Sequence, residues 1–198
     1  MLTDVEAVVL TGGASRRMGT DKASLVINGE PIAARTARIL AEECVNVTVL
    51  GREPIEGFAF QSDPEPFPGP RRALDEFAPE FPFVFAASCD MPFFRAQVVT
   101  LLRDEIGQSD AAIPSVGGFL QPLCALYRAQ SLGPFEGESS MMSLLRRLEV
   151  AVLDAGRLVS LGVDPEWIRS FNTPEELADL DNAPSARPTR YRCAPKIW

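Results

Sequence analysis

Short apolar runs alternate along the chain with stretches of mixed polarity. The runs predict buried strands over residues 7–10, 45–50, 58–61, 83–87, 110–114, 122–127 and 150–153. Apolar residues at helical spacing, and proline at a helix start, predict helices over residues 31–43, 71–77, 98–106 and 141–148. Strands that alternate with helices are typical of an α/β fold, so we expect a mainly parallel (mixed) central sheet between helical layers.

Turn and cap signals extend this picture towards the end of the chain. Asn28-Gly29 marks a tight turn. Phe171-Asn172 is interpreted as the end of another short strand, and residues 173–176 have the capping-box pattern of a helix start. Residues 181–198 show no periodicity. We therefore expect a single domain over residues 1–180 and a C-terminal tail over 181–198.

The first predicted strand ends at two glycines, and a loop rich in cations follows. Residues 8–22 read VVLTGGASRRMGTDK. Glycines let backbone N–H groups close around an anion, and Arg16, Arg17 and Lys22 match a polyphosphate. The spacing fits neither a Walker P-loop nor a Rossmann glycine fingerprint. We interpret the loop as a triphosphate cradle, and the alternative is a solvated surface loop.

Two aspartates follow the ends of other predicted strands. Asp63 comes just after residues 58–61 and before the proline-rich stretch 64–70, which predicts a rigid loop. Asp90 comes just after residues 83–87. Ligands gather at the carboxyl ends of parallel strands, so we expect the glycine loop, Asp63 and Asp90 to share one site.

Each polar candidate keeps a second interpretation at this point. Asp90 can hold Mg²⁺ beside substrate phosphates, or it can cap the following helix. Asp63 can bind a ribose hydroxyl or stabilise the proline-rich turn. Asn172 can ligate the metal, or it can simply precede the helix start at Thr173.

Composition narrows the chemistry. The 198 residues include no histidine, which excludes Ser-His-Asp and Cys-His catalysis and His-ligated zinc. Phosphoryl or nucleotidyl transfer fits this limit, because its catalysis is mostly positioning and charge neutralisation. The net charge of -8 argues against a nucleic-acid partner, since phosphate backbones select basic surfaces.

Other features bear on compartment and assembly. No run approaches the roughly 20 apolar residues of a membrane span, and the N-terminus lacks a secretory pattern. We therefore expect no membrane association and a cytoplasmic protein, and we expect a monomer. Cys44, Cys89, Cys124 and Cys193 stand singly, which favours buried, reduced thiols over a zinc site.

Taken together, the motifs resemble those of the molybdenum cofactor guanylyltransferase family. The glycine loop with Asp21-Lys22 is similar to that family's LAGG-x-S-x-RMG-x-DK. Further similar segments are FPGP at 67–70, CDMP at 89–92, QPLCALY at 121–127 and NTPEEL at 172–177. They occur in the family's order and cover about residues 5–180.

The resemblance implies a Rossmann-like nucleotidyltransferase fold and a specific reaction. GMP would pass from GTP to molybdenum-molybdopterin, with release of pyrophosphate and with Mg²⁺ as the cofactor. Hand-over of the product to a molybdoenzyme or its chaperone is a further partner interaction that the resemblance raises. The alternatives are a related nucleotidyltransferase that uses CTP or another phosphorylated acceptor, and a GTP-binding domain without turnover.

The resemblance also implies roles for single residues. Its nucleotide-binding positions are Leu10, Thr11, Gly12, Gly13, Lys22, Asp63 and Asp90. Backbone groups of the first three would hold the guanine, and Asp63 would lie near the nucleoside. Arg16, Lys22 and Asp90 would act in catalysis, the two cations on the triphosphate. Asp90 would bind Mg²⁺, and Asn172 is the second candidate ligand.

Three positions depart from the family's pattern. After Pro-Gly-Pro the chain continues Arg71-Arg72-Ala73 instead of Leu-Ala-Gly, and the two cations either meet substrate phosphates or face solvent. Ser170 stands where some members carry a second asparagine. The second strand ends with Leu50-Gly51-Arg52, without the asparagine that other members use on the base.

Overall fold

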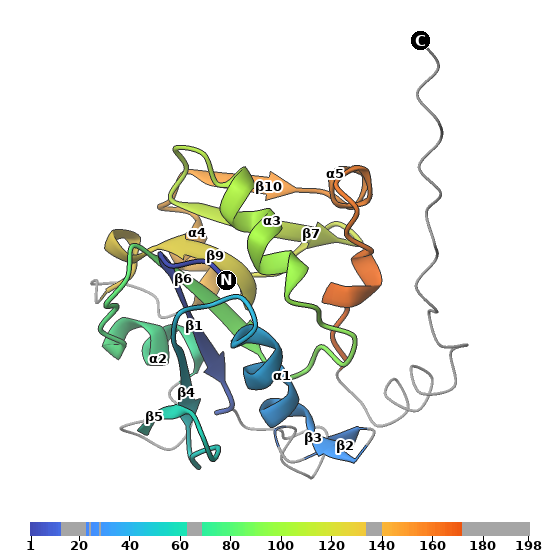
Figure 1. The fold of residues 1–198 in the computed structure, drawn as a ribbon. Coiled ribbons are helices and arrows are strands. Elements are labelled where there is room, and N and C mark those ends of the chain that lie inside the picture. Colours follow the sequence, from blue (N-terminus) through green and yellow to red (C-terminus); the bar gives the residue numbers. More distant parts are fainter. Residues whose placement is uncertain (13–22, 24, 28, 63–68, 134–139, 172–198) are drawn as a thin grey trace.

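The computed structural model describes residues 1–12, 23, 25–27, 29–62, 69–133 and 140–171, and it is built around one mixed sheet (Figure 1). The strand order is β10-β7-β9-β6-β1-β4-β5, and β8 pairs with β7 off this path. The strands are β1 (Val5–Leu10), β4 (Val47–Gly51), β5 (Ala59–Ser62), β6 (Phe83–Ser88), β7 (Ala111–Val116), β8 (Phe119–Leu120), β9 (Cys124–Arg128) and β10 (Val150–Leu153).

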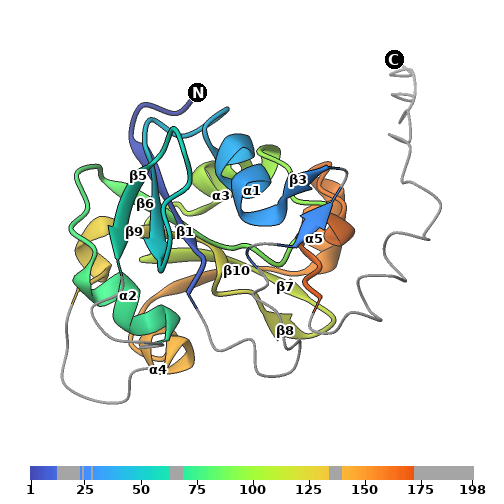
Figure 2. The same cartoon turned by 90° about the horizontal axis from the view of Figure 1, so that it is seen from below.

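Most neighbouring strands in the sheet are parallel. β1 runs parallel to β4 and β6, β4 to β5, and β10 to β7. β9 is antiparallel to both β6 and β7, and β8 is antiparallel to β7. A separate antiparallel hairpin joins β2 (Val26–Ile27) and β3 (Glu30–Pro31), and Figure 2 shows it outside the main sheet. The predicted mainly parallel, mixed sheet is therefore confirmed.

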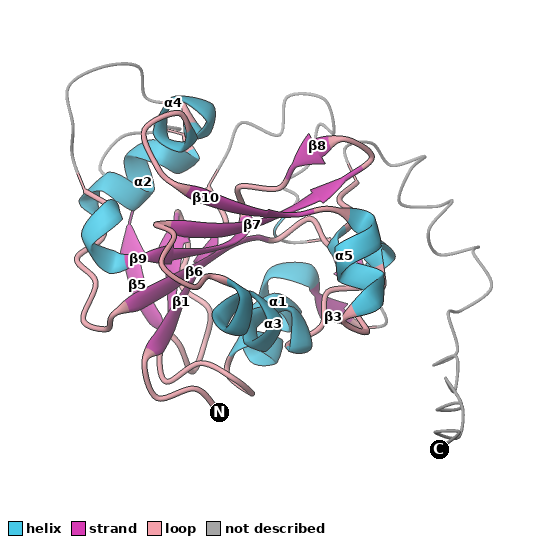
Figure 3. Cartoon of the chain, turned by 90° about the horizontal axis from the view of Figure 1, so that it is seen from above, coloured by secondary structure: helices cyan, strands magenta, loops and turns pink. Residues whose placement is uncertain are grey.

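Helices cover both faces of the sheet. They are α1 (Ile32–Leu40), α2 (Pro70–Glu76), α3 (Gln97–Glu105), α4 (Met141–Leu145) and α5 (Ala155–Ser160). Figure 3 shows α1 and α3 on one face and α2 and α4 on the other. The three-layer arrangement that the alternation of strands and helices predicted is confirmed.

Strand β1 shows why the apolar runs are continuous rather than alternating. Val5, Ala7 and Val9 pack with buried residues of α1 and α3. Val8 and Leu10 point to the opposite face and pack with buried residues of α2 and α4. A central strand that is covered on both faces needs apolar side chains at successive positions.

One polar residue of β1 is buried as well. Glu6 is 3% exposed, and its Oε1 accepts hydrogen bonds from the backbone N–H groups of Glu80 at 2.7 Å and Phe81 at 2.8 Å. These bonds tie the segment before β6 to β1. Burial nevertheless raises the pKa of the Glu6 carboxyl above its usual value of 4.5.

Most of the predicted elements have counterparts, with shifted ends. Each of the seven predicted strands and four predicted helices is present, although α1 begins just after Pro31 and ends at Leu40. The sequence did not reveal α5, β8 or the 3₁₀ helix Pro165–Ile168. The prediction of a short strand that ends at Phe171-Asn172 is wrong at Phe171, which is in no strand, and Asn172 lies outside the described residues.

The predictions for the end of the chain stay untested. The helix start at 173–176 and the tail over 181–198 lie outside the described residues, so the division into a domain over 1–180 and a tail remains a prediction. Within the described ranges, no helix has the length and apolar character that crossing a membrane requires.

Candidate active site

The register of the parallel strands aligns their carboxyl ends in one row. Leu10 of β1 pairs with Leu50 of β4 on one side and with Ser88 of β6 on the other. Gly51 of β4 pairs with Ser62 of β5. The segments that leave these strands therefore start from the same edge of the sheet. The sequence predicted this shared edge for the glycine loop and Asp90.

The first turn after β1 lies directly against β4. The backbone N–H of Thr11 donates to the carbonyl of Leu50 at 2.9 Å, and the Thr11 hydroxyl donates to the same oxygen at 3.2 Å. A Cβ on Gly51 would lie 2.0 Å from Thr11 Oγ1 and 3.0 Å from the nitrogen of Gly12. The course of Thr11 and Gly12 thus depends on the missing side chain at Gly51.

Asp90 is positioned by a residue that sequence reasoning missed. The hydroxyl of Ser88, the last residue of β6, donates to Asp90 Oδ1 at 2.6 Å. The backbone N–H of Ser88 donates to the carbonyl of Leu123 at 2.8 Å, which ties this turn to the segment before β9. The pKa of the Cys124 thiol is raised, mainly by burial and to a lesser extent by the negative charge of Asp90. A serine two residues before a strand-end aspartate was the available signal.

The capping interpretation of Asp90 is wrong. The next helix, α3, begins at Gln97, and its N-cap is Ala96, which offers no side-chain hydrogen bond. Asp90 instead lies at the edge of the sheet, half-buried, with its carboxylate oriented by Ser88.

A distant part of the chain returns to Asp90. The backbone N–H of Phe171 donates to the carbonyl of Asp90 at 3.1 Å. Its ring is fully buried in a small cluster that includes Ile27, Ile32 and Cys89. Asn172 is the next residue in the sequence and lies outside the described residues.

The two arginines after Pro-Gly-Pro have different environments. Arg71 is 1% exposed, and its Nη2 donates to the Gly133 carbonyl at 2.9 Å and pairs with Asp75 at 2.5 Å. Burial lowers the pKa of Arg71 and raises the pKa of Asp75. Arg72 is exposed and pairs with Glu76 at 2.7 Å. Arg71 therefore does not face solvent, and its position in the fold is structural.

The turn into α2 explains the glycine between the two prolines. Gly69 is the N-cap of α2 and has φ 87, a conformation that favours glycine, and Pro70 is the first helical residue. Gly69, Pro70 and Ala73 border a hollow of about 10 Å³ together with Leu10 and Gly12. The Pro-Gly-Pro segment thus adjoins the turn after β1.

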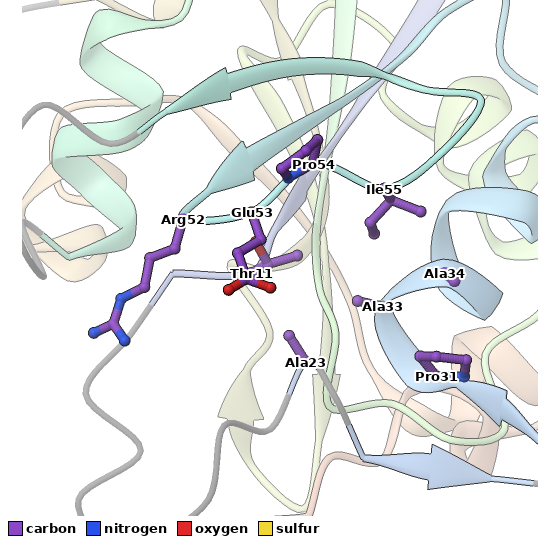
Figure 4. Close-up of a pocket in the computed structure, with 9 residues that line it drawn as sticks. All are labelled: Thr11, Ala23, Pro31, Ala33, Ala34, Arg52, Glu53, Pro54 and Ile55. Atoms are coloured by element: carbon purple, nitrogen blue, oxygen red, sulfur yellow. The ribbon is translucent and has the colours of Figure 1, made fainter.

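Thr11 also lines a larger cavity of about 290 Å³ (Figure 4). Its remaining lining residues come from the start of α1, from Ala23 and from the loop between β4 and β5. They are Ala23, Pro31, Ala33, Ala34, Arg52, Glu53, Pro54 and Ile55. Sequence reasoning did not single out Glu53, Pro54 or Ile55 as site residues, because a loop sequence does not show which cavity it borders.

Several predicted site residues lie outside the described residues. They are Gly13, Arg16, Lys22, Asp63 and Asn172. The structure brings Leu10, Thr11, Gly12 and Asp90 to one edge of the sheet. The assignments of all nine residues to nucleotide, metal or catalysis remain predictions.

The sequence is similar to one protein family and to several of its named members. Residues 7–152 match a family model described as the MobA-like NTP transferase domain. The chain is similar to a probable molybdenum cofactor guanylyltransferase of Synechococcus elongatus, with 32% identity over 194 residues. This match covers 86% of this chain and 94% of the relative.

Solved structures show the same fold. The molybdopterin-guanine dinucleotide biosynthesis protein A of Archaeoglobus fulgidus superposes with a TM-score of 0.72 at 23% identity, covering 88% of this chain and 95% of that one. Rv0371C of Mycobacterium tuberculosis in complex with manganese superposes with a TM-score of 0.57 at 14% identity, covering 77% of this chain and 88% of that one.

Proposed function

Because the chain belongs to the MobA-like NTP transferase family and is a nucleotidyltransferase, we propose that it transfers GMP from GTP to molybdenum-molybdopterin. Pyrophosphate is the second product. The name of the Synechococcus relative, which matches nearly end to end, supports this reaction. The observation that carries the proposal is that the Thr11-Gly12 turn and the oriented Asp90 carboxylate follow neighbouring strand ends at one edge of the sheet.

The turn after β1 is the proposed nucleotide contact. Leu10, Thr11 and Gly12, with Gly13 next in sequence, would offer backbone groups to the guanine. The hydrogen bonds from Thr11 to Leu50 hold this turn before any ligand arrives, which lowers the entropic cost of binding.

The remaining nucleotide contacts in the proposal come from side chains outside the described residues. Arg16 and Lys22 would neutralise the triphosphate, and Asp63 would lie near the nucleoside. Lys22 directly precedes Ala23, which lines the cavity beside Thr11.

The reaction needs no general base, which fits a chain without histidine. The attacking group is a phosphate oxygen of the pterin, which is already ionised at neutral pH. The chain's task is to hold this oxygen in line with the α-phosphorus of GTP and to keep cations on the phosphate oxygens. The guanine turn and the triphosphate cations would provide that alignment.

Asp90 is the proposed ligand of the divalent ion, which we take to be Mg²⁺. A half-buried carboxylate that is oriented by a serine hydroxyl is the kind of oxygen ligand that Mg²⁺ prefers. Asn172 is the second candidate. The manganese complex of the M. tuberculosis protein is consistent with a divalent ion in this fold. When bound, the ion would neutralise charge on the phosphate oxygens.

The test is pyrophosphate release from GTP, Mg²⁺ and intact molybdenum-molybdopterin. Asp90→Asn should lower turnover by roughly 10-fold or more, because a lost charge-assisted contact of about 1.5–3 kcal/mol has that effect on a rate. Asp104→Asn, at an exposed position of α3, is the matched control and should leave turnover unchanged.

Two outcomes would favour the alternatives instead. Release of pyrophosphate with CTP but not with GTP would identify a related nucleotidyltransferase with another base preference. Binding of GTP without release, in the presence of intact acceptor, would identify a GTP-binding domain without turnover.

The proposal extends to the protein's surroundings. We expect a cytoplasmic monomer that hands its product to a molybdoenzyme or its chaperone. Within the described part of the chain, Cys44, Cys89 and Cys124 are buried and form no disulfide, which suits a reducing compartment. Size-exclusion chromatography with light scattering checks the oligomeric state.

A further inference from the structure

Among the described residues that line the cavity beside Thr11, one has an acidic side chain. Among its described lining residues, Thr11, Arg52 and Glu53 carry polar side chains, and the others are alanine, proline or isoleucine. The volume of about 290 Å³ is close to the lower limit of about 300 Å³ for ligand pockets. Mostly apolar walls with few polar groups suit a flat, uncharged ring better than a triphosphate.

Both hydrogen-bond donors of Thr11, its backbone N–H and its hydroxyl, are engaged within the protein. Its backbone N–H and its hydroxyl both donate to the Leu50 carbonyl, at 2.9 and 3.2 Å. Figure 4 shows Arg52 extending away from the cavity, whereas Glu53 lies on the side of Thr11. Of the three described polar side chains that line the cavity, Glu53 is therefore the one that can hydrogen-bond to a ligand there.

The side chain of Glu53 is accessible to a ligand. It is exposed at the mouth of the cavity, on the loop that joins β4 to β5. No hydrogen bond or ion pair with another described residue occupies its carboxylate. A ligand can therefore reach it without a change in the fold.

The chemistry of a carboxylate selects among the bases. A carboxylate only accepts hydrogen bonds, and its two oxygens can receive two donors side by side. Guanine presents two adjacent donors, N1–H and the N2 amino group, on its pairing edge. Adenine and cytosine place an acceptor beside their amino group, and the N3–H of uracil stands between two carbonyl oxygens. A carboxylate on the wall thus favours guanine over the other three bases.

We propose that Glu53 is a specificity-determining residue, whose carboxylate accepts the N1–H and N2 amino protons of guanine. The inference rests on the proposed function, which makes a guanine nucleotide the substrate. It supplies a base-reading side chain in a chain whose second strand ends with Leu50-Gly51-Arg52, without an asparagine. The carboxylate and the turn at Thr11 would then hold the base from two sides.

Inosine triphosphate is the probe that isolates this contact, because it differs from GTP only in lacking the N2 amino group. Equilibrium binding of GTP, ITP, ATP and CTP is measured by calorimetry on the full chain. The wild-type protein should bind GTP roughly 10-fold or more tightly than ITP, as expected for a hydrogen bond to a charged group.

Glu53→Gln is nearly isosteric. Its amide oxygen can still accept from N1–H, which GTP and ITP share, but its amide nitrogen is a donor that opposes the N2 amino group of GTP alone. The variant should lower GTP affinity roughly 10-fold and bring the GTP-to-ITP ratio close to one. Glu56→Gln, on the same loop but outside the cavity lining, is the matched control and should keep the wild-type ratio. Unchanged melting temperatures of the ligand-free variants would show that folding is intact.

Three results would overturn the inference. A wild-type ratio in Glu53→Gln would show that the carboxylate does not contact the base, even if GTP remains the preferred nucleotide. Equal losses of GTP and ITP affinity would show that Glu53 acts on another part of the nucleotide. Preference of the wild-type protein for CTP or ATP would instead refute the proposed function, and this outcome is seen without any variant.

Discussion

Gly51→Ala adds one methyl group where β4 meets the turn after β1. The new Cβ would lie 2.0 Å from Thr11 Oγ1, 3.2 Å from Thr11 Cβ and 3.0 Å from the nitrogen of Gly12. Gly51 is not among the glycines with positive φ, so the backbone itself accepts alanine. The whole effect therefore comes from the contact with the turn.

The cost has two parts. Thr11 must rotate its hydroxyl away, which breaks the 3.2 Å hydrogen bond to the Leu50 carbonyl and costs about 0.5–1.5 kcal/mol. The remaining crowding against Gly12 is an overpacking effect of about 1–3 kcal/mol. We expect Gly51→Ala to lower the free energy of unfolding by the sum of these two costs, about 1.5–4.5 kcal/mol. We also expect it to weaken GTP binding, because the turn itself must move.

Urea denaturation measures the stability change, and calorimetry measures GTP affinity. Gly156→Ala is the matched control, because its Cβ meets only Asp154 Oδ1 at 3.4 Å, an ordinary contact. In helix α5 that change should be neutral or stabilise by about 0.5–1 kcal/mol.

A double-mutant cycle tests the mechanism of the Gly51 effect. Thr11→Ala removes the nearest clashing atom, so it should cost less in the Gly51→Ala background than in the wild-type protein. If Gly51→Ala changed stability by less than ~0.5 kcal/mol and left GTP affinity intact, the close approach of the two segments would be refuted.

Two further predictions concern buried charges. Arg71→Met should destabilise by about 3–5 kcal/mol in urea unfolding, because it leaves the mostly buried Asp75 carboxylate, which is 12% exposed, without its ion-pair partner. Adding Asp75→Leu should recover part of the loss, and no recovery would contradict the pair's role. For Glu6, the raised pKa means that the folded state binds the proton more tightly, so the contribution of this carboxyl to stability falls as pH rises from about 4.5 through its folded pKa. Glu6→Gln should remove that dependence, and a stability difference from wild type that is constant from pH 4.5 to pH 8 would speak against it.

Much of the fold could be predicted because its strands are buried on both faces. Successive apolar residues such as those of β1 identify central strands without any knowledge of their partners. Helix α5 was missed because six residues that include a glycine and an arginine carry little periodicity. Its N-cap, Asp154, which accepts from the N–H of Arg157 at 2.8 Å, was the one local signal.

The candidate site also has features that the sequence could predict and features that it could not. The position of Asp90 and of the turn at Thr11 at one edge of the sheet could be predicted, because both directly follow parallel strands. The contact of Ser88 with Asp90 and the place of Glu53 on the cavity wall could not be predicted, since a hydroxyl or a carboxylate near a strand end has many ordinary uses. Only the cavity and the hydrogen bond to Asp90 Oδ1 distinguish these two residues from their neighbours.

The sequence alone determined the α/β class, the order of the elements and a phosphate chemistry without histidine, because these follow from local periodicity, glycine placement and residue type. The tertiary structure decided which residues meet. Gly51 contacts Thr11 and Arg71 reaches Gly133 only through strand register and helix packing between segments about 40 and 62 positions apart. Register is a property of the paired strands together, so neither strand's own sequence states it.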